Sequence, residues 1–342
     1  MKRTIFLALA LCLAVLSGCG GKTVPEVKPL QVEGTVLYAG DEPFCARGVS
    51  FGWHNIWPRF YNEAAAEEIV SVWGAPVLRA AIGVDDHAKS DNPDCHGGYI
   101  TEPEFALECL CSVIDGAVRS GAYVIVDWHS HTLHKAEAEE FFAKVAELYK
   151  DCPNVIYELF NEPVSREFED SRDYSEPTQE SLDAYWAELK DYAESIISII
   201  DKTSSCHPLI LMGCPRWDQA IDAAARNPIT TYDNLMYTVH FYAATHKGWL
   251  RDRTDRAIEA GLPVFISECA ACEASGDGPV DEESWNEWNV WAAERGITML
   301  TWSISDKAET CSMFTPEASS EGPWSEDVIK PWGKTVKEWL RK

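Results

Sequence analysis

Two glutamates far apart in the chain each end an apolar run. Glu162 follows the segment V-I-Y-E-L-F-N that starts at Val155, and Glu268 ends the segment L-P-V-F-I-S-E that starts at Leu262. Such near-continuous apolar runs are typical of buried parallel strands. Two facing carboxylates are the minimum equipment for glycoside hydrolysis, because one protonates the leaving oxygen while the other attacks the sugar or activates water. The alternative is a pair of unrelated surface glutamates in a chain with 55 acidic residues.

Strand-like and helix-like segments alternate eight times after a short N-terminal hairpin over Gln31–Ala46, whose turn is Ala39–Pro43. This alternation predicts a (β/α)8 TIM barrel with its chemistry at the C-terminal ends of the strands. We expect the hairpin to cover the barrel bottom and Glu158 to lie in the interior or at the bottom face. The alternative, an open doubly wound sheet, predicts a glycine-rich phosphate-binding loop after an early strand, and the sequence contains none. The predicted strands are Ala46–Trp53, Pro76–Val84, Tyr123–Ser130, Val155–Glu162, Pro208–Cys214, Leu235–Tyr242, Pro263–Cys269 and Ile297–Ile304.

The connecting segments read as helices, several of which end at a glycine. Gly74, Gly121, Gly261 and Gly296 stand where a helix C-cap is expected. The predicted helices are Glu63–Trp73, Pro103–Ser120, Lys135–Lys150, Ser181–Ile200, Asp218–Arg226, Lys247–Glu259, Glu282–Glu294 and Glu326–Arg341.

Polar and aromatic side chains stand at or just after the C-terminal ends of the predicted strands. In a barrel these ends converge on one site. We therefore expect the two glutamates to have many polar neighbours. The residues at these positions are Arg79, His129, Asn161, Glu162, Trp217, His240, Tyr242, Glu268 and Trp302.

Seven sequence blocks share a pattern with one known family. They are Gly48–Trp53, Leu78–Ala81, Gly97–Ile100, Val126–His129, Val155–Pro163, Tyr237–Ala243 and Thr301–Glu309. In this order they resemble glycoside hydrolase family 5, in particular the endo-β-1,4-glucanase (cellulase) type close to its subfamily 2. The resemblance runs from about residue 30 to the C-terminus.

The resemblance implies a retaining double displacement on a (β/α)8 barrel. By position, Glu162 matches the general acid/base and Glu268 the nucleophile. Asn161 matches the residue whose amide bonds the sugar 2-hydroxyl, and Arg79 and Tyr242 match groups that orient the nucleophile. In a retaining enzyme the two carboxyls lie about 5–5.5 Å apart, so each raises the proton affinity of the other.

Six further positions match groups that bind the sugars. They are His129 and His240 around the cleaved bond, Trp302 beneath the sugar before it, Trp217 in the glycone half of the cleft, and Lys307 with Glu309 at the next sugar. The chain departs from the family after the nucleophile, where Cys269 and Ala270 replace an aromatic residue and a glycine. It also has Gly83 in place of an aromatic residue, which predicts a wider mouth beside the cleaved bond.

Three metal-like patterns are present, and we expect none of them to bind a metal. In H-S-H-T-L-H only His129 matches the family, and no acidic or cysteine partner stands at a useful spacing for His131 and His134. The acidic loop over residues 85–94 reads as solvated rather than as a Ca²⁺ site. The lone C-x-x-C from Cys269 to Cys272 is a weak signal without a second pair. We expect no cofactor.

The composition is compatible with a neutral polymer as partner, and the N-terminal segment indicates export. The formal net charge of −26 disfavours nucleic acid and anionic membrane surfaces, and the 14 tryptophans suit stacking on sugar faces. The N-terminus has Lys2 and Arg3, a short apolar stretch, and Leu16-Ser-Gly-Cys19, which resembles a bacterial lipoprotein signal; a plain secretory signal is the alternative. We expect a signal peptide at residues 1–18, a tether at 19–30 with lipid on Cys19, and a monomeric catalytic domain at 31–342.

The hypothesis is an endo-acting β-1,4-glucanase that is lipid-anchored at the bacterial cell envelope, facing the periplasm or the cell surface, and that acts on a β-glucan polysaccharide or oligosaccharide. A mannanase, xyloglucanase or mixed-linkage glucanase would use the same carboxylates. A lipoprotein that binds glycan without cutting it would be expected to lose Glu162 or Glu268. A metal-dependent hydrolase would lose activity with a chelator. The sequence does not fix the pairing of the ten cysteines beyond Cys12 and Cys19.

Overall fold

The computed structural model describes residues 25–86, 92, 94–165 and 177–342. The predicted signal peptide, the lipidation site Cys19 and the first part of the predicted tether lie outside the described residues, as does Asp91 of the acidic loop. Among the helices that are described, none is both long and apolar enough to cross a bilayer.

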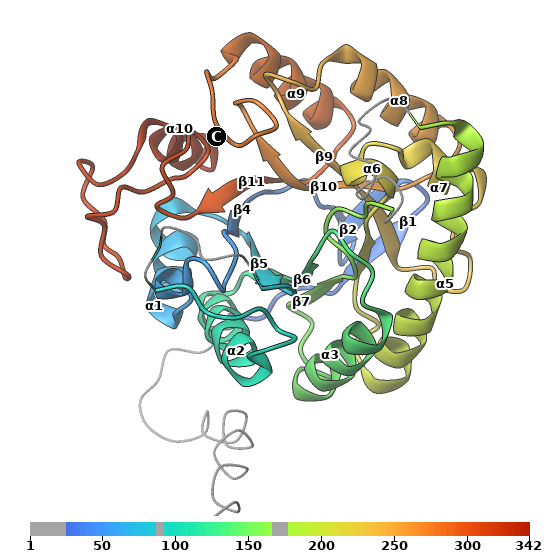
Figure 1. The fold of residues 1–342 in the computed structure, drawn as a ribbon, viewed down its shortest axis with the longest axis horizontal. Helices are drawn as coiled ribbons and strands as arrows, with labels where there is room; N and C mark the ends of the chain where they lie inside the picture. Colours follow the sequence, from blue (N-terminus) through green and yellow to red (C-terminus); the bar gives the residue numbers. More distant parts are fainter. Residues whose placement is uncertain (1–24, 87–91, 93, 166–176) are drawn as a thin grey trace, which may run out of the picture.

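Eight parallel strands close into a barrel in the order β10-β11-β4-β5-β6-β7-β8-β9, which confirms the predicted fold class (Figure 1). Every position of β5 and β6 is buried, because one face fills the barrel and the other packs against the outer helices. The strands are β4 (Arg47–Phe51), β5 (Val77–Gly83), β6 (Tyr123–His129), β7 (Val155–Glu158), β8 (Ile210–Met212), β9 (Leu235–Tyr242), β10 (Val264–Ala270) and β11 (Met299–Ile304).

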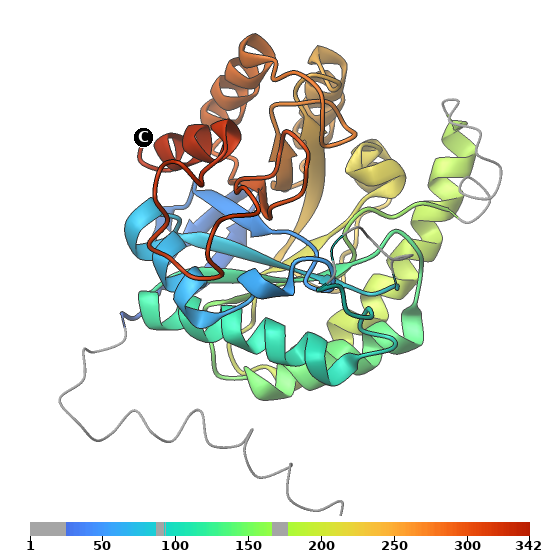
Figure 2. The same ribbon diagram turned by 60° about the vertical axis from the view of Figure 1, so that its left-hand side comes forward.

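The helices form an outer layer around the barrel (Figures 1 and 2). The four predicted cap glycines, Gly74, Gly121, Gly261 and Gly296, have φ of 89°, 74°, 93° and 66°, as a left-handed C-cap requires. The helices are η2 (Pro58–Phe60), α1 (Glu63–Glu68) continued by η3 (Ile69–Trp73), α2 (Pro103–Ser120), α3 (Lys135–Leu148), α5 (Gln179–Thr203), α6 (Pro215–Asp218), α7 (Ile221–Arg226), α8 (Gly248–Glu259), α9 (Glu282–Glu294) and α10 (Pro331–Trp339).

Two predicted helix starts are wrong. Asp218 does not begin a helix: it has φ 60° and ends α6, a short turn whose inner residues are left-handed, and the regular helix α7 begins at Ile221. The last helix begins at Pro331 rather than Glu326, since proline is favoured in the first helical turn.

The N-terminal segment forms three antiparallel strands rather than the predicted single hairpin. They are β1 (Leu30–Glu33), β2 (Val36–Ala39) and β3 (Glu42–Pro43). Gly34, with φ 63°, makes an additional turn between β1 and β2. Leu30 and Leu37 pack into one cluster with the inward-facing floor residues of the barrel, including Ile125 and Leu211. The small sheet therefore closes the barrel bottom, as expected.

The barrel interior changes from apolar at the floor to polar at the mouth. Alternate residues of one strand face inward, so on β6 the apolar Ile125 is followed on the same face by Asp127 and His129. On β7 Ile156 belongs to the floor cluster and is followed by Glu158, which is fully buried. Glu158 thus lies in the barrel interior, one of the two places expected for it, and polar residues fill the upper barrel beneath the strand ends.

Candidate active site

Glu162 and Glu268 lie together at the C-terminal end of the barrel. Glu268 is on β10, while Glu162 follows β7 in the loop, because that strand ends at Glu158 rather than continuing to Glu162 as predicted. One carboxylate oxygen of each, together with a ring nitrogen of His240, lie within 4.8 Å of one another. This spacing fits the short separation of a retaining pair and leaves little room for the intervening water of an inverting enzyme.

Both carboxylates line one open cavity of about 840 Å³. Five of the other predicted site residues also line it, so the barrel brings together segments that are far apart in the chain. These are His129, Tyr242, Trp302, Lys307 and Glu309.

Arg79 on β5 holds the base of the site together. Its Nη1 donates to Glu268 Oε2 at 2.9 Å and its Nη2 donates to Asn161 Oδ1 at 2.6 Å. Its Nε donates to Glu158 Oε2 at 2.7 Å, and Nη2 also lies 2.9 Å from Asp127 Oδ2. The guanidinium is fully buried. A planar fork of five donors is the one side chain that can bind this many acceptors at fixed angles.

Glu268 has two donors on its carboxylate, one on each oxygen. Besides Arg79, Tyr242 on β9 donates its hydroxyl to Glu268 Oε1 at 2.7 Å. Burial and the neighbouring Glu162 raise the pKa of Glu268, against the opposing effects of His240, Arg79 and the Tyr242 hydrogen bond. The two donors therefore fix the orientation of Glu268, while its ionisation requires a pH above the ordinary glutamate value.

Glu162 has a histidine at each carboxylate oxygen. His240 Nδ1 is 3.0 Å from Glu162 Oε1, and His131 Nε2 is 3.4 Å from Oε2. Burial raises the pKa of Glu162, but the hydrogen bond and charge of His240, with smaller effects of His131 and Arg79, lower it below its usual value overall. The proton of this pair therefore rests mainly on His240 when no sugar is bound.

His240, on β9, is buried among acidic side chains. Burial lowers the pKa of His240, but Asp218 and then Glu158, Glu162 and Glu268 raise it well above the usual histidine value. The imidazole is therefore a cation that lies between buried carboxylates and the cavity.

Aromatic side chains form one side of the cavity. The rings of His129 and Trp302 are parallel, with an interplanar angle of 6° and centroids 5.3 Å apart, and Trp53 lies edge-on to His129 at 4.2 Å. His129 Nδ1 is 2.6 Å from Asp127 Oδ2, which fixes the ring. Flat apolar rings beside carboxylates are suited to a sugar, which has an apolar CH face and a polar edge.

Of the three predicted contacts to outer sugars, Lys307 and Glu309 line the cavity and Trp217 does not. Lys307 and Glu309 form an ion pair with each other in the cavity wall. Trp217 is not among the residues that line this cavity. It is partly exposed and has φ 52° in the turn after β8.

The two sequence departures are accommodated locally. Cys269 Sγ donates to the Leu300 carbonyl at 3.2 Å, and the side chain packs in the core outside the barrel. A Cβ on Gly83 would lie 2.3 Å from Asn55 Oδ1 and 3.0 Å from the Trp53 ring. These two side chains occupy the space beside Gly83, so the wider mouth expected there does not follow from the missing aromatic.

The described residues contain two groups with metal-like spacing, Glu158-Asp218-His240 and Glu162-His240-Glu268. The oxygens of Glu158 and Glu268 already accept from Arg79, Tyr242 and Ser267. Asp218 accepts from Thr238 and the Cys214 backbone, and Glu162 faces His240 and His131. The three histidines of H-S-H-T-L-H face different partners, since His129 bonds Asp127, His131 faces Glu162 and His134 bonds Asp85. Of the C-x-x-C pair, Cys269 donates a hydrogen bond to the Leu300 carbonyl, whereas the thiol of Cys272 is hydrogen-bonded to that of Cys311. Both are free cysteines. The donor sets therefore fit hydrogen bonding better than a metal.

Sequence reasoning missed four polar residues of the site. Asp127 lies inside the block Val126–His129, and its alternation with His129 on one face of β6 was an available signal. His131 lies in the loop after this strand. Ser267 precedes Glu268, and a β-bulge between Phe265 and Glu268 alters the simple alternation there. Asp218 had no local signal, because a left-handed turn at a residue other than glycine is not read from sequence.

The model of the family described as "Cellulase (glycosyl hydrolase family 5)" matches residues 37–308. The chain belongs to this family. It is 30% identical to endoglucanase Z of Dickeya dadantii over 97% of its own length and 73% of that protein, and 31% identical to endoglucanase A of Evansella cellulosilytica over 88% and 57%. The chain thus spans only part of the length of these relatives.

Solved structures of an endoglucanase and of a mannanase share the fold. The catalytic domain of a Thermobifida fusca endoglucanase in complex with cellotetraose aligns with a TM-score of 0.76 at 27% identity, over 92% of this chain and 97% of that one. A β-mannanase of Thermomonospora fusca aligns with a TM-score of 0.62 at 18% identity, over 91% and 94%. At that identity the mannanase shares the fold, and the likeness carries no information on substrate.

Proposed function

We propose that this family 5 glycoside hydrolase cleaves internal β-1,4-glucosidic bonds of cellulose or a related β-glucan by a retaining double displacement. The observation that carries the proposal is the pair Glu162 and Glu268, with oxygens within 4.8 Å in an open cavity. The names of several relatives and neighbours at 25–31% identity, which are endoglucanases or cellulases, support the choice of a β-glucan.

In the first step Glu268 attacks the anomeric carbon and the leaving oxygen takes a proton from Glu162. Arg79 and Tyr242 hold one oxygen of Glu268 each, which orients the carboxylate for attack. Because Arg79 occupies the Asn161 amide oxygen, the Asn161 amide nitrogen is the group that can donate to a sugar hydroxyl.

The proton for the leaving oxygen comes from the His240–Glu162 pair. In the sugar-free site it rests mainly on His240, one hydrogen bond of 3.0 Å away from Glu162. A bound sugar displaces water from the cavity and disfavours the charged pair, which moves the proton to Glu162. In the second step Glu162 accepts a proton from the water that releases the sugar from Glu268.

His129, Trp53 and Trp302 would hold the sugar beside the cleaved bond, and Lys307 with Glu309 would bind its neighbour in the chain. Trp217 would stack on a sugar further along the glycone half. The net charge of −26 is compatible with an uncharged polysaccharide as substrate.

The test is release of reducing sugar from carboxymethyl-cellulose, barley glucan, xyloglucan, mannan and xylan, with Glu268→Gln as the control. We expect wild type to release sugar from one of the β-1,4-glucans and to lower its viscosity early, as internal cleavage does. Equal release by wild type and control on every polymer would rule out hydrolysis by this site. Release from mannan or xyloglucan alone would favour the related substrate instead. Retention is tested by NMR of the anomer formed first.

We further propose that the protein is a lipoprotein anchored at the bacterial cell envelope through Cys19. The support is the sequence Leu16-Ser-Gly-Cys19 after an apolar stretch. Cells that express the full chain should incorporate labelled palmitate into it and retain it in the membrane fraction, and Cys19→Ala should abolish both. Labelling that persists in the Cys19 variant, or a wild-type protein found wholly in the soluble fraction, would exclude this anchor.

A further inference from the structure

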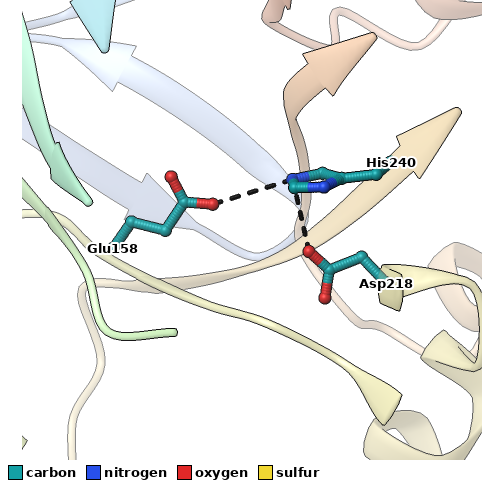
Figure 3. A group of neighbouring side chains, drawn as sticks. All are labelled: Glu158, Asp218 and His240. Atoms are coloured by element: carbon teal, nitrogen blue, oxygen red, sulfur yellow. Dashed lines mark ion pairs between the residues drawn. The ribbon is translucent and has the colours of Figure 1, made fainter. Parts of the chain in front are cut away.

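A buried acid lies behind the histidine that contacts Glu162. His240 Nδ1 is 3.0 Å from Glu162 Oε1, and its other nitrogen, Nε2, is 3.2 Å from Asp218 Oδ2. Figure 3 shows Asp218 and Glu158 facing the same end of the His240 ring, with Asp218 reaching it from the turn that follows β8. His240 therefore connects a fully buried carboxyl group to the carboxyl group in the cavity.

The hydrogen bonds around His240 determine which nitrogen carries a fixed proton. Ser267 donates its hydroxyl proton to Glu158 Oε1 at 2.6 Å, and Arg79 holds the same carboxylate. Burial raises the pKa of Glu158, but Arg79 and His240 lower it below its usual value overall, so it is an acceptor. Ser267 Oγ must then accept from His240 Nε2 at 2.8 Å. One proton remains, shared between His240 Nδ1 and Glu162.

Asp218 is held in place by its surroundings. Thr238 donates to Asp218 Oδ2 at 2.8 Å, and the Cys214 backbone N–H donates to Asp218 Oδ1. Arg216, Trp217 and Asp218 all have left-handed φ, at 62°, 52° and 60°. Such conformations persist only where the surrounding structure enforces them, and they cluster at functional sites.

Building on the proposed function, we propose that Asp218 is a positioning residue that orients His240 on Glu162 and sets how tightly the His240–Glu162 pair holds the proton destined for the leaving oxygen. No bond to the sugar is made by Asp218, which is fully buried and acts only through His240.

The direction of the effect follows from charge. Asp218 in its ionised form is the largest influence that raises the pKa of His240, ahead of Glu158, Glu162 and Glu268. Burial, with smaller effects of Glu162 and Glu158, raises the pKa of Asp218 itself well above its usual value. The charge of His240 and the hydrogen bond from Thr238 act against this rise and favour the ionised form, on which the proposed effect depends. Removing the carboxylate charge should let the His240–Glu162 pair release its proton at lower pH. The other titratable groups that face this array are Glu158, Glu268, Arg79, His131, His246, Arg216 and Cys214.

The test variant is Asp218→Asn, because asparagine has nearly the same shape and tolerates the φ of 60°. It removes the charge and replaces one acceptor oxygen by an NH2 donor. Asp233→Asn is the matched control, since Asp233 also pairs with a histidine, His207, but with a side chain that is 91% exposed. The pH profile of kcat/KM is measured on cellopentaose and on dinitrophenyl β-cellobioside. The dinitrophenolate leaves with little need of a proton, so this substrate reports on the nucleophile alone.

For Asp218→Asn we expect the basic limb of the cellopentaose profile to move down by roughly one pH unit, with a larger loss of activity on cellopentaose than on the dinitrophenyl substrate. Asp233→Asn should keep the wild-type profile. If Asp218→Asn does not fold, Thr238→Val removes the hydroxyl donor to Asp218, reduces its ionisation and should move the limb in the same direction.

An unchanged basic limb in the folded variant, or equal losses on the two substrates, would overturn the role of Asp218. That failure is distinct from failure of the proposed function, in which wild type itself would cleave neither substrate.

Discussion

Replacing Arg79 by lysine tests whether the buried fork, rather than its charge alone, supports the site. The guanidinium binds Glu158, Glu268, Asn161 and Asp127 through three different nitrogens. A lysine has one nitrogen with three donors, and so cannot reach partners on opposite sides. At least two charge-assisted contacts should be lost, each of about 1.5–3 kcal/mol, which lowers the free energy of unfolding by about 3–6 kcal/mol.

The magnitude can be converted to measurable quantities. An unfolding entropy of about 2.1 cal/mol/K per residue over 342 residues turns this loss into a fall in Tm of about 4–8 °C. Because two of the partners are Glu268 and Asn161, kcat/KM on the preferred glucan should also fall by more than about 100-fold. The assays are differential scanning calorimetry and reducing-sugar release.

Arg119→Lys is the matched control for this experiment. Arg119 also contacts two carboxylates, Glu63 and Glu67, but its side chain is 42% exposed. Exposed pairs contribute below about 1 kcal/mol, so Tm should change by about 1 °C at most and activity not at all. If Arg79→Lys were as stable and as active as Arg119→Lys, the reasoning about the buried fork would be refuted.

Three other changes have defined outcomes. Tyr242→Phe removes a donor to Glu268 and raises the already raised pKa of that carboxyl further. Because the nucleophile must be ionised, the acidic limb of the pH profile of kcat/KM should move up by roughly 1–2 pH units. An unmoved limb would mean that the hydroxyl does not act on Glu268. Trp302→Ala removes the ring that lies parallel to His129 and should raise KM roughly 10-fold, measured on a soluble oligosaccharide, whereas an unchanged KM would place no sugar on this ring. Addition of EDTA should leave the rate unchanged, and a loss restored by a divalent ion would support the metal-dependent alternative.

The sequence alone determined the order of the elements and the two carboxylates. Buried parallel strands and amphipathic helices leave periodic signals within a few turns of chain, and the cap glycines need only their local φ. The barrel, the strand-end position of Glu268 and the interior position of Glu158 followed from these signals. The single hairpin and the start of the last helix were misread, since short strands and element ends have weak signals.

Only the tertiary structure decided which side chains of the site contact one another. The approach of Glu162 to Glu268 depends on barrel closure, which joins residues about a hundred positions apart. The four partners of Arg79 depend on the register of neighbouring strands, which cannot be predicted from the local sequence. Asp218 reaches His240 through a left-handed turn held by Thr238 and the backbone of Cys214. Such a conformation costs free energy locally, and only contacts with residues distant in the chain offset that cost. No local sequence pattern could therefore predict it.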